Sequence, residues 1–164
     1  MVGRTRFLTL LSAALYLAVA AGSLGRTPST PTDPADFIAA VLLYLLTWAL
    51  ARLRVPLPAA GSVSLHFFGA LTAVLILPPF WASLVAALSL PFSPPFLRDI
   101  FNRSQVGLSA LLAGWASPYP LLPLVVYLGV NLSAVFLMAW VSGYPPAAFF
   151  RKNLRPYLLG YWLI

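Results

Sequence analysis

Long apolar stretches alternate with short polar or proline-rich breaks along the whole chain. Most of these stretches approach the length of roughly 20 residues that a helix needs to cross a bilayer, although two in the middle are shorter. The breaks contain proline or clustered charges, which mark helix ends. The pattern predicts about seven membrane-spanning segments, at about residues 7–24, 37–53, 63–77, 80–90, 96–115, 121–141 and from 154 onward.

The last predicted segment begins near Leu154 and is about half the length of a spanning helix where the sequence ends at Ile164. A helix that stopped there would leave unpaired backbone carbonyls in hydrocarbon. We therefore expect residues 1–164 to be a single integral-membrane domain, the N-terminal part of a longer protein. It would contain about six complete spans and a truncated seventh.

Composition agrees with this class. The chain is 61% hydrophobic and 8% charged, whereas a soluble domain has roughly 25% charged residues. Cysteine is absent from the sequence, so disulfides and thiolate metal sites are excluded. The sequence predicts an all-α, polytopic transmembrane helix bundle.

Basic residues recur at alternate breaks of the pattern. Arg4 and Arg6 precede the first segment. The breaks after the first, third and fifth segments together contain one basic residue, Arg26, and two acidic residues, Asp33 and Asp36. The positive-inside rule then places the N-terminus in the cytoplasm of a multi-pass protein in the bacterial inner membrane. The net charge of +7 reflects this topology, so we expect the lipid bilayer as partner and no nucleic acid. The topology-setting bases of the later breaks are Arg52, Arg54, Arg98, Arg103, Arg151, Lys152 and Arg155.

No catalytic constellation can be assembled from the titratable residues. The chain has one histidine, three acidic residues and no cysteine, which excludes a His/Cys metal cluster and a paired-glutamate site. Neither a Walker-type loop nor a GxGxxG motif is present. We expect this segment to be no enzyme and to hold neither metal nor cofactor.

Four polar residues near or within the predicted spans are candidates for ligand binding, because polar side chains in a membrane usually face protein or water. Each also has a structural interpretation: packing for the histidine, and interhelical hydrogen bonds for the amides. Arg98 or Arg103 can pair with Asp99 or with lipid phosphate. Small residues recur in the third to fifth segments, which indicates either tight packing or discontinuous helices around a binding cavity. The four candidates are His66, Asn102, Gln105 and Asn131.

Several short motifs resemble the N-terminal membrane region of bacterial HD-type (HD-GYP-like) phosphohydrolases and of some diguanylate cyclases. The motifs are RVPLP (54–58), GSVSL (61–65), SLVAAL (83–88), FNRSQVGLSALLAG (101–114), VYLGVN (126–131) and FRKNLR (150–155). The resemblance implies an anchoring or sensory module ahead of a cytoplasmic catalytic domain. The family's metal ligands belong to that domain, which this sequence does not include. With the N-terminus inside, such a domain requires an eighth helix after Ile164. A homodimer is compatible with this role.

Two other functions stay open. The same central pattern is similar to the substrate-binding membrane subunits of energy-coupling-factor vitamin transporters, which have about six spans and hold a small molecule in the bundle. That resemblance implies a small-molecule ligand near the four polar candidates. The third alternative is a structural or assembly subunit of a membrane complex.

Overall fold

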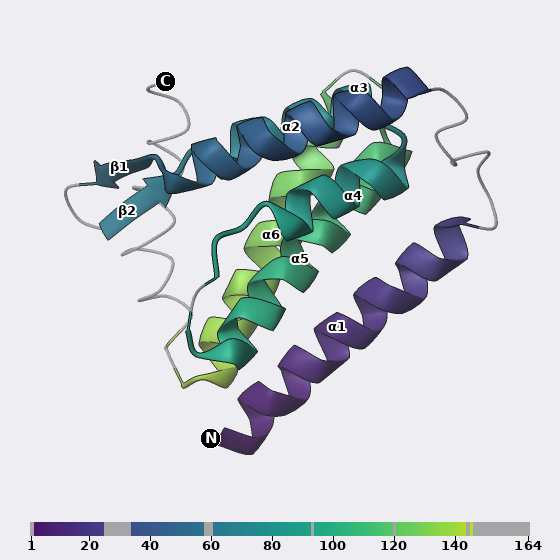
Figure 1. The fold of residues 1–164 in the computed structure, drawn as a ribbon. Coiled ribbons are helices and arrows are strands. Elements are labelled where there is room, and N and C mark those ends of the chain that lie inside the picture. Colours follow the sequence, from purple (N-terminus) through teal and green to yellow (C-terminus); the bar gives the residue numbers. More distant parts are fainter. Residues whose placement is uncertain are drawn as a thin grey trace.

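The computed structural model describes residues 2–24, 34–57, 61–92, 94–119, 121–143 and 145. Within these residues the chain forms six helices and one small β-hairpin (Figure 1). A helix lies at each of the first six predicted segments, and the segment predicted from residue 154 lies outside the described residues. The helices are α1 Val2–Leu24, α2 Pro34–Arg52, α3 His66–Ile76, α4 Pro79–Leu88, α5 Phe96–Trp115 and α6 Leu122–Val141.

Prolines set most of the helix starts. Pro34 and Pro79 are the first residues of α2 and α4, while Pro95 immediately precedes α5. Proline is tolerated in the first helical turn because its missing N–H would have no partner there. Asp36 and Asp99 lie in the first turns of α2 and α5, where a negative charge suits the helix dipole. Helix α5 has the same bounds as the fifth predicted segment, 96–115.

A β-hairpin between α2 and α3 corrects the purely helical prediction. Strand β1 (Arg54–Leu57) pairs antiparallel with β2 (Gly61–Ser64), so that Arg54 lies opposite Ser64 and Leu57 opposite Gly61. The predicted span from residue 63 began too early, because the chain at that point is still extended and α3 starts at His66. Pro56 fits a two-stranded hairpin because each strand has one edge without a neighbouring strand, and at that edge the missing backbone N–H of proline costs no hydrogen bond between strands.

Helix α5 is the centre of the bundle. It packs against α4, α6 and α1, and it also contacts α3. Helix α2 lies against α3 and α4, so the short helices α3 and α4 are enclosed between α2 and α5. Small side chains fill this region: Ala70, Ala73, Ala82, Ala86 and Ala110 are all fully buried.

Only part of the chain has full-length apolar helices. Three helices of the described residues are long and apolar enough to cross a membrane: Gly3–Ser23, Pro34–Arg52 and Leu122–Val141. Helices α3 and α4 have 11 and 10 residues, which at about 1.5 Å per residue is about half of a bilayer core. Helix α5 has 20 residues but includes Arg98, Asp99 and Arg103. The number of complete crossings therefore does not follow from helix lengths alone.

The outer surfaces of the long helices are apolar. Large side chains of α1, α2 and α6 are exposed, among them Leu17, Leu42 and Val125, each more than 60% exposed. Apolar surfaces of this extent on a soluble protein would be covered by a partner. On these helices they suit contact with lipid.

Two glycines allow helices to approach closely. A Cβ atom on Gly69 of α3 would lie 2.8 Å from the Cα atom of Thr47 in α2. A Cβ atom on Gly114 of α5 would lie 2.9 Å from the Cα atom of Pro79, the first residue of α4. Because these neighbours are backbone atoms, the helices themselves would have to separate to admit a side chain.

We expect Gly69→Ala to lower the free energy of unfolding by about 1–3 kcal/mol, because the methyl group forces α2 and α3 apart. Thermal unfolding of the purified protein in detergent measures the change. Gly129→Ala in α6 is the matched control, since its added Cβ meets no atom of another element within 4 Å and alanine favours helix by up to about 1 kcal/mol. Equal effects of the two substitutions would contradict close α2–α3 packing.

Candidate functional site at the carboxyl end of α4

Helix α4 ends inside the bundle, beside α5 and the start of α3. The last carbonyl groups of a helix have no partner within it and must be satisfied from outside. In a low-dielectric surrounding an unpaired carbonyl costs free energy. The chain after Leu88 turns away through Ser89, the C-cap residue, and does not continue the helix.

Arg103 of α5 supplies most of the missing donors. Its Nη1 atom donates to the carbonyl oxygens of Ala87 and Leu88, at 3.1 and 3.2 Å. Its Nη2 atom donates to the carbonyl oxygen of Leu90 at 2.7 Å. Arginine suits this task because its guanidinium presents five donors in a rigid plane. Its positive charge also complements the negative end of the α4 dipole.

Asp99 orients the guanidinium from one helical turn away. The Nε atom of Arg103 donates to Oδ2 of Asp99 at 2.7 Å, and the Asp99 side chain is only 6% exposed. A buried carboxylate needs a charged or hydrogen-bonding partner. The pair thus balances its own charge while the other guanidinium nitrogens face α4.

His66, the first residue of α3, binds the same helix end from the other side. Its Nε2 atom lies 3.0 Å from both the carbonyl oxygen of Ala86 and the hydroxyl oxygen of Ser89. A carbonyl oxygen can only accept, so the contact with Ala86 requires a proton on Nε2. The Ser89 hydroxyl donates to the same carbonyl at 3.3 Å. His66 and Arg103 together therefore satisfy the carboxyl end of α4.

The start of α3 is itself tied to α2. The backbone N–H of His66 donates to Oγ of Ser64 at 3.1 Å, and the Ser64 hydroxyl donates to the carbonyl oxygen of Ala51 at 3.1 Å. Ser64 thus links the end of α2 to the start of α3. These contacts favour the packing interpretation of His66 over a free ligand-binding histidine.

The remaining candidates lie elsewhere on α5 and α6. Gln105 is buried, and its Oε1 atom has no hydrogen-bond partner within the described part of the chain. Asn102 and Asn131 are partly buried. The four predicted site residues form no hydrogen-bonded cluster with one another among the described residues, because His66 is engaged with α4 and Ser64. The described residues also contain no group of three or more potential metal ligands.

Sequence reasoning identified three residues of this site, Arg103, Asp99 and His66, but not the helix end that they satisfy. Arg98 or Arg103 was expected to pair with Asp99 or with lipid phosphate, and the structure shows the Arg103–Asp99 pair. Arg103 was counted with the loop bases that set topology, yet it lies in the second turn of α5 and points into the bundle. Its partners on α4 are backbone carbonyls, which leave no residue-type signal in a sequence. Ser89 was missed for the same reason.

We expect Arg103→Gln to lower the free energy of unfolding by about 3 kcal/mol, because it removes the positive charge that faces the buried Asp99 carboxylate and removes donors from the end of α4. Arg98→Gln is the matched control: Arg98 is an exposed arginine in the first turns of the same helix, and its loss should change stability by less than about 0.5 kcal/mol. Chemical unfolding in detergent, followed by tryptophan fluorescence, measures both. Equal free energies of unfolding for the two variants would show that Arg103 does not stabilise the end of α4.

Comparison with known proteins adds no family to this description. No protein-family model, curated protein or solved structure matches the chain. The interpretation of its function therefore depends on its own residues and contacts.

Proposed function

We propose that the chain is a multi-pass module of the bacterial inner membrane that anchors a cytoplasmic signalling domain and couples to it through the helix bundle. The domain would hydrolyse or make a cyclic dinucleotide, as the sequence resemblance implies. One observation supports this role most directly: the charged and polar groups at the carboxyl end of α4 bind each other and the backbone. They hold the bundle together and leave few groups for a transported substrate.

The arrangement of the helix ends supports a cytoplasmic N-terminus. Arg4 near the start of α1 and Val141 at the end of α6 line one hollow, so these two helix ends meet. Helix α5 packs against α6 and is joined to it by a short connection, so its start with Arg98 faces the same end. Positive charge gathered at one end of a bundle marks the cytoplasmic side.

The α3–α4 pair does not alter this assignment. Two half-length helices joined at Leu77 and Pro78 enter and return on the same side, whether they cross fully or turn back within the bilayer. We propose that they form a re-entrant pair between the crossing helices, as discontinuous helices do in many membrane proteins. Helices α1, α2, α5 and α6 would then cross.

The absence of cysteine from the sequence allows this topology to be tested with single cysteines. Ser117→Cys, between α5 and α6, should react with a membrane-impermeant maleimide added to intact spheroplasts. Ser142→Cys, directly after α6, should react only after the membrane is opened. The substitutions are nearly isosteric, so both proteins should fold. Labelling of Ser142→Cys in closed spheroplasts would contradict a cytoplasmic N-terminus.

The substrate-binding subunit of a vitamin transporter is the second candidate function. The buried, unpartnered Oε1 atom of Gln105 favours it, since a ligand with an N–H or O–H group could donate to this oxygen. The short helices α3 and α4 are also typical of substrate sites in transporters.

Two measurements separate these functions. The signalling proposal expects the gene to continue beyond the Ile164 codon, to complete the apolar segment that begins near residue 154, to add one further span, and to encode a domain with a histidine–aspartate metal motif or a GGDEF-like run. A stop codon at that position would contradict the proposal. Denaturing extraction of the purified protein, followed by mass spectrometry, should release no stoichiometric vitamin. A retained vitamin that Gln105→Leu abolishes would establish the alternative.

A further inference from the structure

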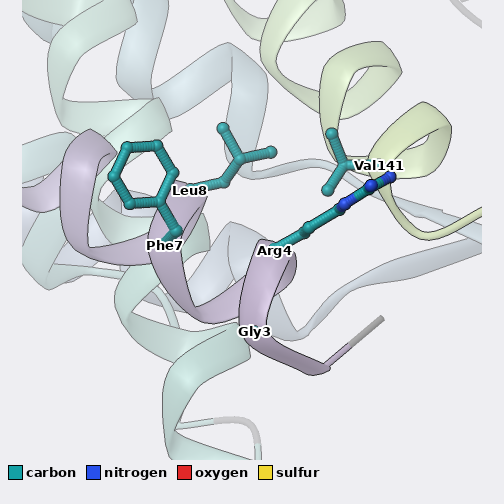
Figure 2. Close-up of a pocket in the computed structure, with 5 residues that line it drawn as sticks. All are labelled: Gly3, Arg4, Phe7, Leu8 and Val141. Atoms are coloured by element: carbon teal, nitrogen blue, oxygen red, sulfur yellow. The ribbon is translucent and has the colours of Figure 1, made fainter.

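A shallow apolar hollow lies where the start of α1 meets the end of α6 (Figure 2). Its volume is about 280 Å³, and its lining is almost wholly apolar, because Arg4 borders it mainly with carbon atoms of its side chain. Figure 2 shows the Arg4 side chain extended along the hollow toward Val141, with Leu8 and Phe7 following on α1. The hollow is open to the outside of the bundle, and Phe7 is 65% exposed.

We propose that this hollow binds an anionic phospholipid, with the phosphate on the Arg4 guanidinium and the adjoining acyl chain against Phe7, Leu8 and Val141. A guanidinium offers paired N–H donors that match two phosphate oxygens. The Arg4 side chain is exposed and makes no hydrogen bond or ion pair within the described residues, so it is available to an external anion.

The neighbouring residues fit a headgroup above an acyl chain. Gly3, one residue before Arg4, also lines the hollow and places no side chain in it. The next residue of the lining is Phe7, one helical turn further along α1. Charge at the rim and apolar surface below it reproduce the order of groups in a phospholipid.

A specific site differs from general attraction between basic residues and an anionic membrane. Arg6 provides the comparison, because it is exposed and lies two residues from Arg4 on α1. Two residues correspond to about 200° around a helix, so the side chains leave on different faces. Arg6 is not among the residues that line the hollow. Each arginine contributes the same net charge, and only Arg4 has the apolar surface beside it.

The test is native mass spectrometry of the purified chain, titrated in detergent with dioleoyl phosphatidylglycerol or with dioleoyl phosphatidylcholine. We expect the wild-type chain to retain phosphatidylglycerol preferentially. Arg4→Gln should weaken that binding about tenfold, as expected for loss of a charge-assisted hydrogen bond, whereas Arg6→Gln should change it less than about twofold. Val141→Trp, which fills the hollow and retains Arg4, should also weaken binding.

Other outcomes would overturn the proposal. Equal losses in Arg4→Gln and Arg6→Gln would show diffuse attraction, and unchanged binding in Val141→Trp would place the lipid elsewhere. An excess of inorganic phosphate that displaced the lipid would show that the site recognises a free anion. Far-ultraviolet circular dichroism of each variant checks that it is folded, and Leu8→Trp replaces Val141→Trp if the latter is not. The lipid proposal requires a chain embedded in the membrane, but it does not depend on which domain the chain anchors. A failed cysteine-labelling experiment would therefore contradict the proposed topology, whereas a failed lipid titration would contradict only the lipid site.

Discussion

The end of α4 is the point on which the structure depends, because the last carbonyl groups of a helix have no partner within the helix and must be satisfied from outside. Arg103 donates there to the carbonyl oxygens of Ala87, Leu88 and Leu90. His66 lies within hydrogen-bond distance of a fourth carbonyl oxygen, that of Ala86. These contacts attach the α3–α4 pair to α5, and α5 in turn packs against α1 and α6. The buried carboxylate of Asp99 is balanced by the guanidinium of Arg103. The short helices, the central position of α5 and the Arg103–Asp99 pair are therefore parts of one arrangement.

The sequence was sufficient for features with strong local signals. Prolines before or at the first turn located the starts of α2, α4 and α5, since proline restricts the backbone in a way that does not depend on distant contacts. The β-hairpin was not predicted, because its strands are short and lie within an apolar region without clear alternation. The small residues of the third to fifth segments indicated tight packing, but they did not identify the contact between Gly69 and Thr47. Thr47 lies 22 positions before Gly69, and no local sequence pattern connects the two residues.

Half-length helices have a functional meaning that depends on what occupies their ends. In transporters, such ends lie at mid-depth and bind ions or substrates through free backbone groups. Here the carboxyl end of α4 is occupied by Arg103, His66 and Ser89 from the same chain. An occupied end stabilises one packing of the bundle, which suits an anchor or a coupling element better than a substrate site. Gln105 is the exception, since a buried amide oxygen without a partner is a cost that a native structure rarely retains without use.

The basic residues bear on both the proposed topology and the proposed contact with lipid. A pair of short helices that enters and returns on the same side of the membrane leaves the direction of every later helix unchanged. The proposed cytoplasmic N-terminus therefore does not require α3 and α4 to cross. The same basic residues need not be equivalent once the chain is folded. Arg103 is used within the bundle, Arg52 lies 3.6 Å from the ring centre of Trp48, and Arg4 extends over an apolar hollow. Basic residues that one sequence rule treats alike therefore have different surroundings in the folded chain, and only the packing of neighbouring helices distinguishes them.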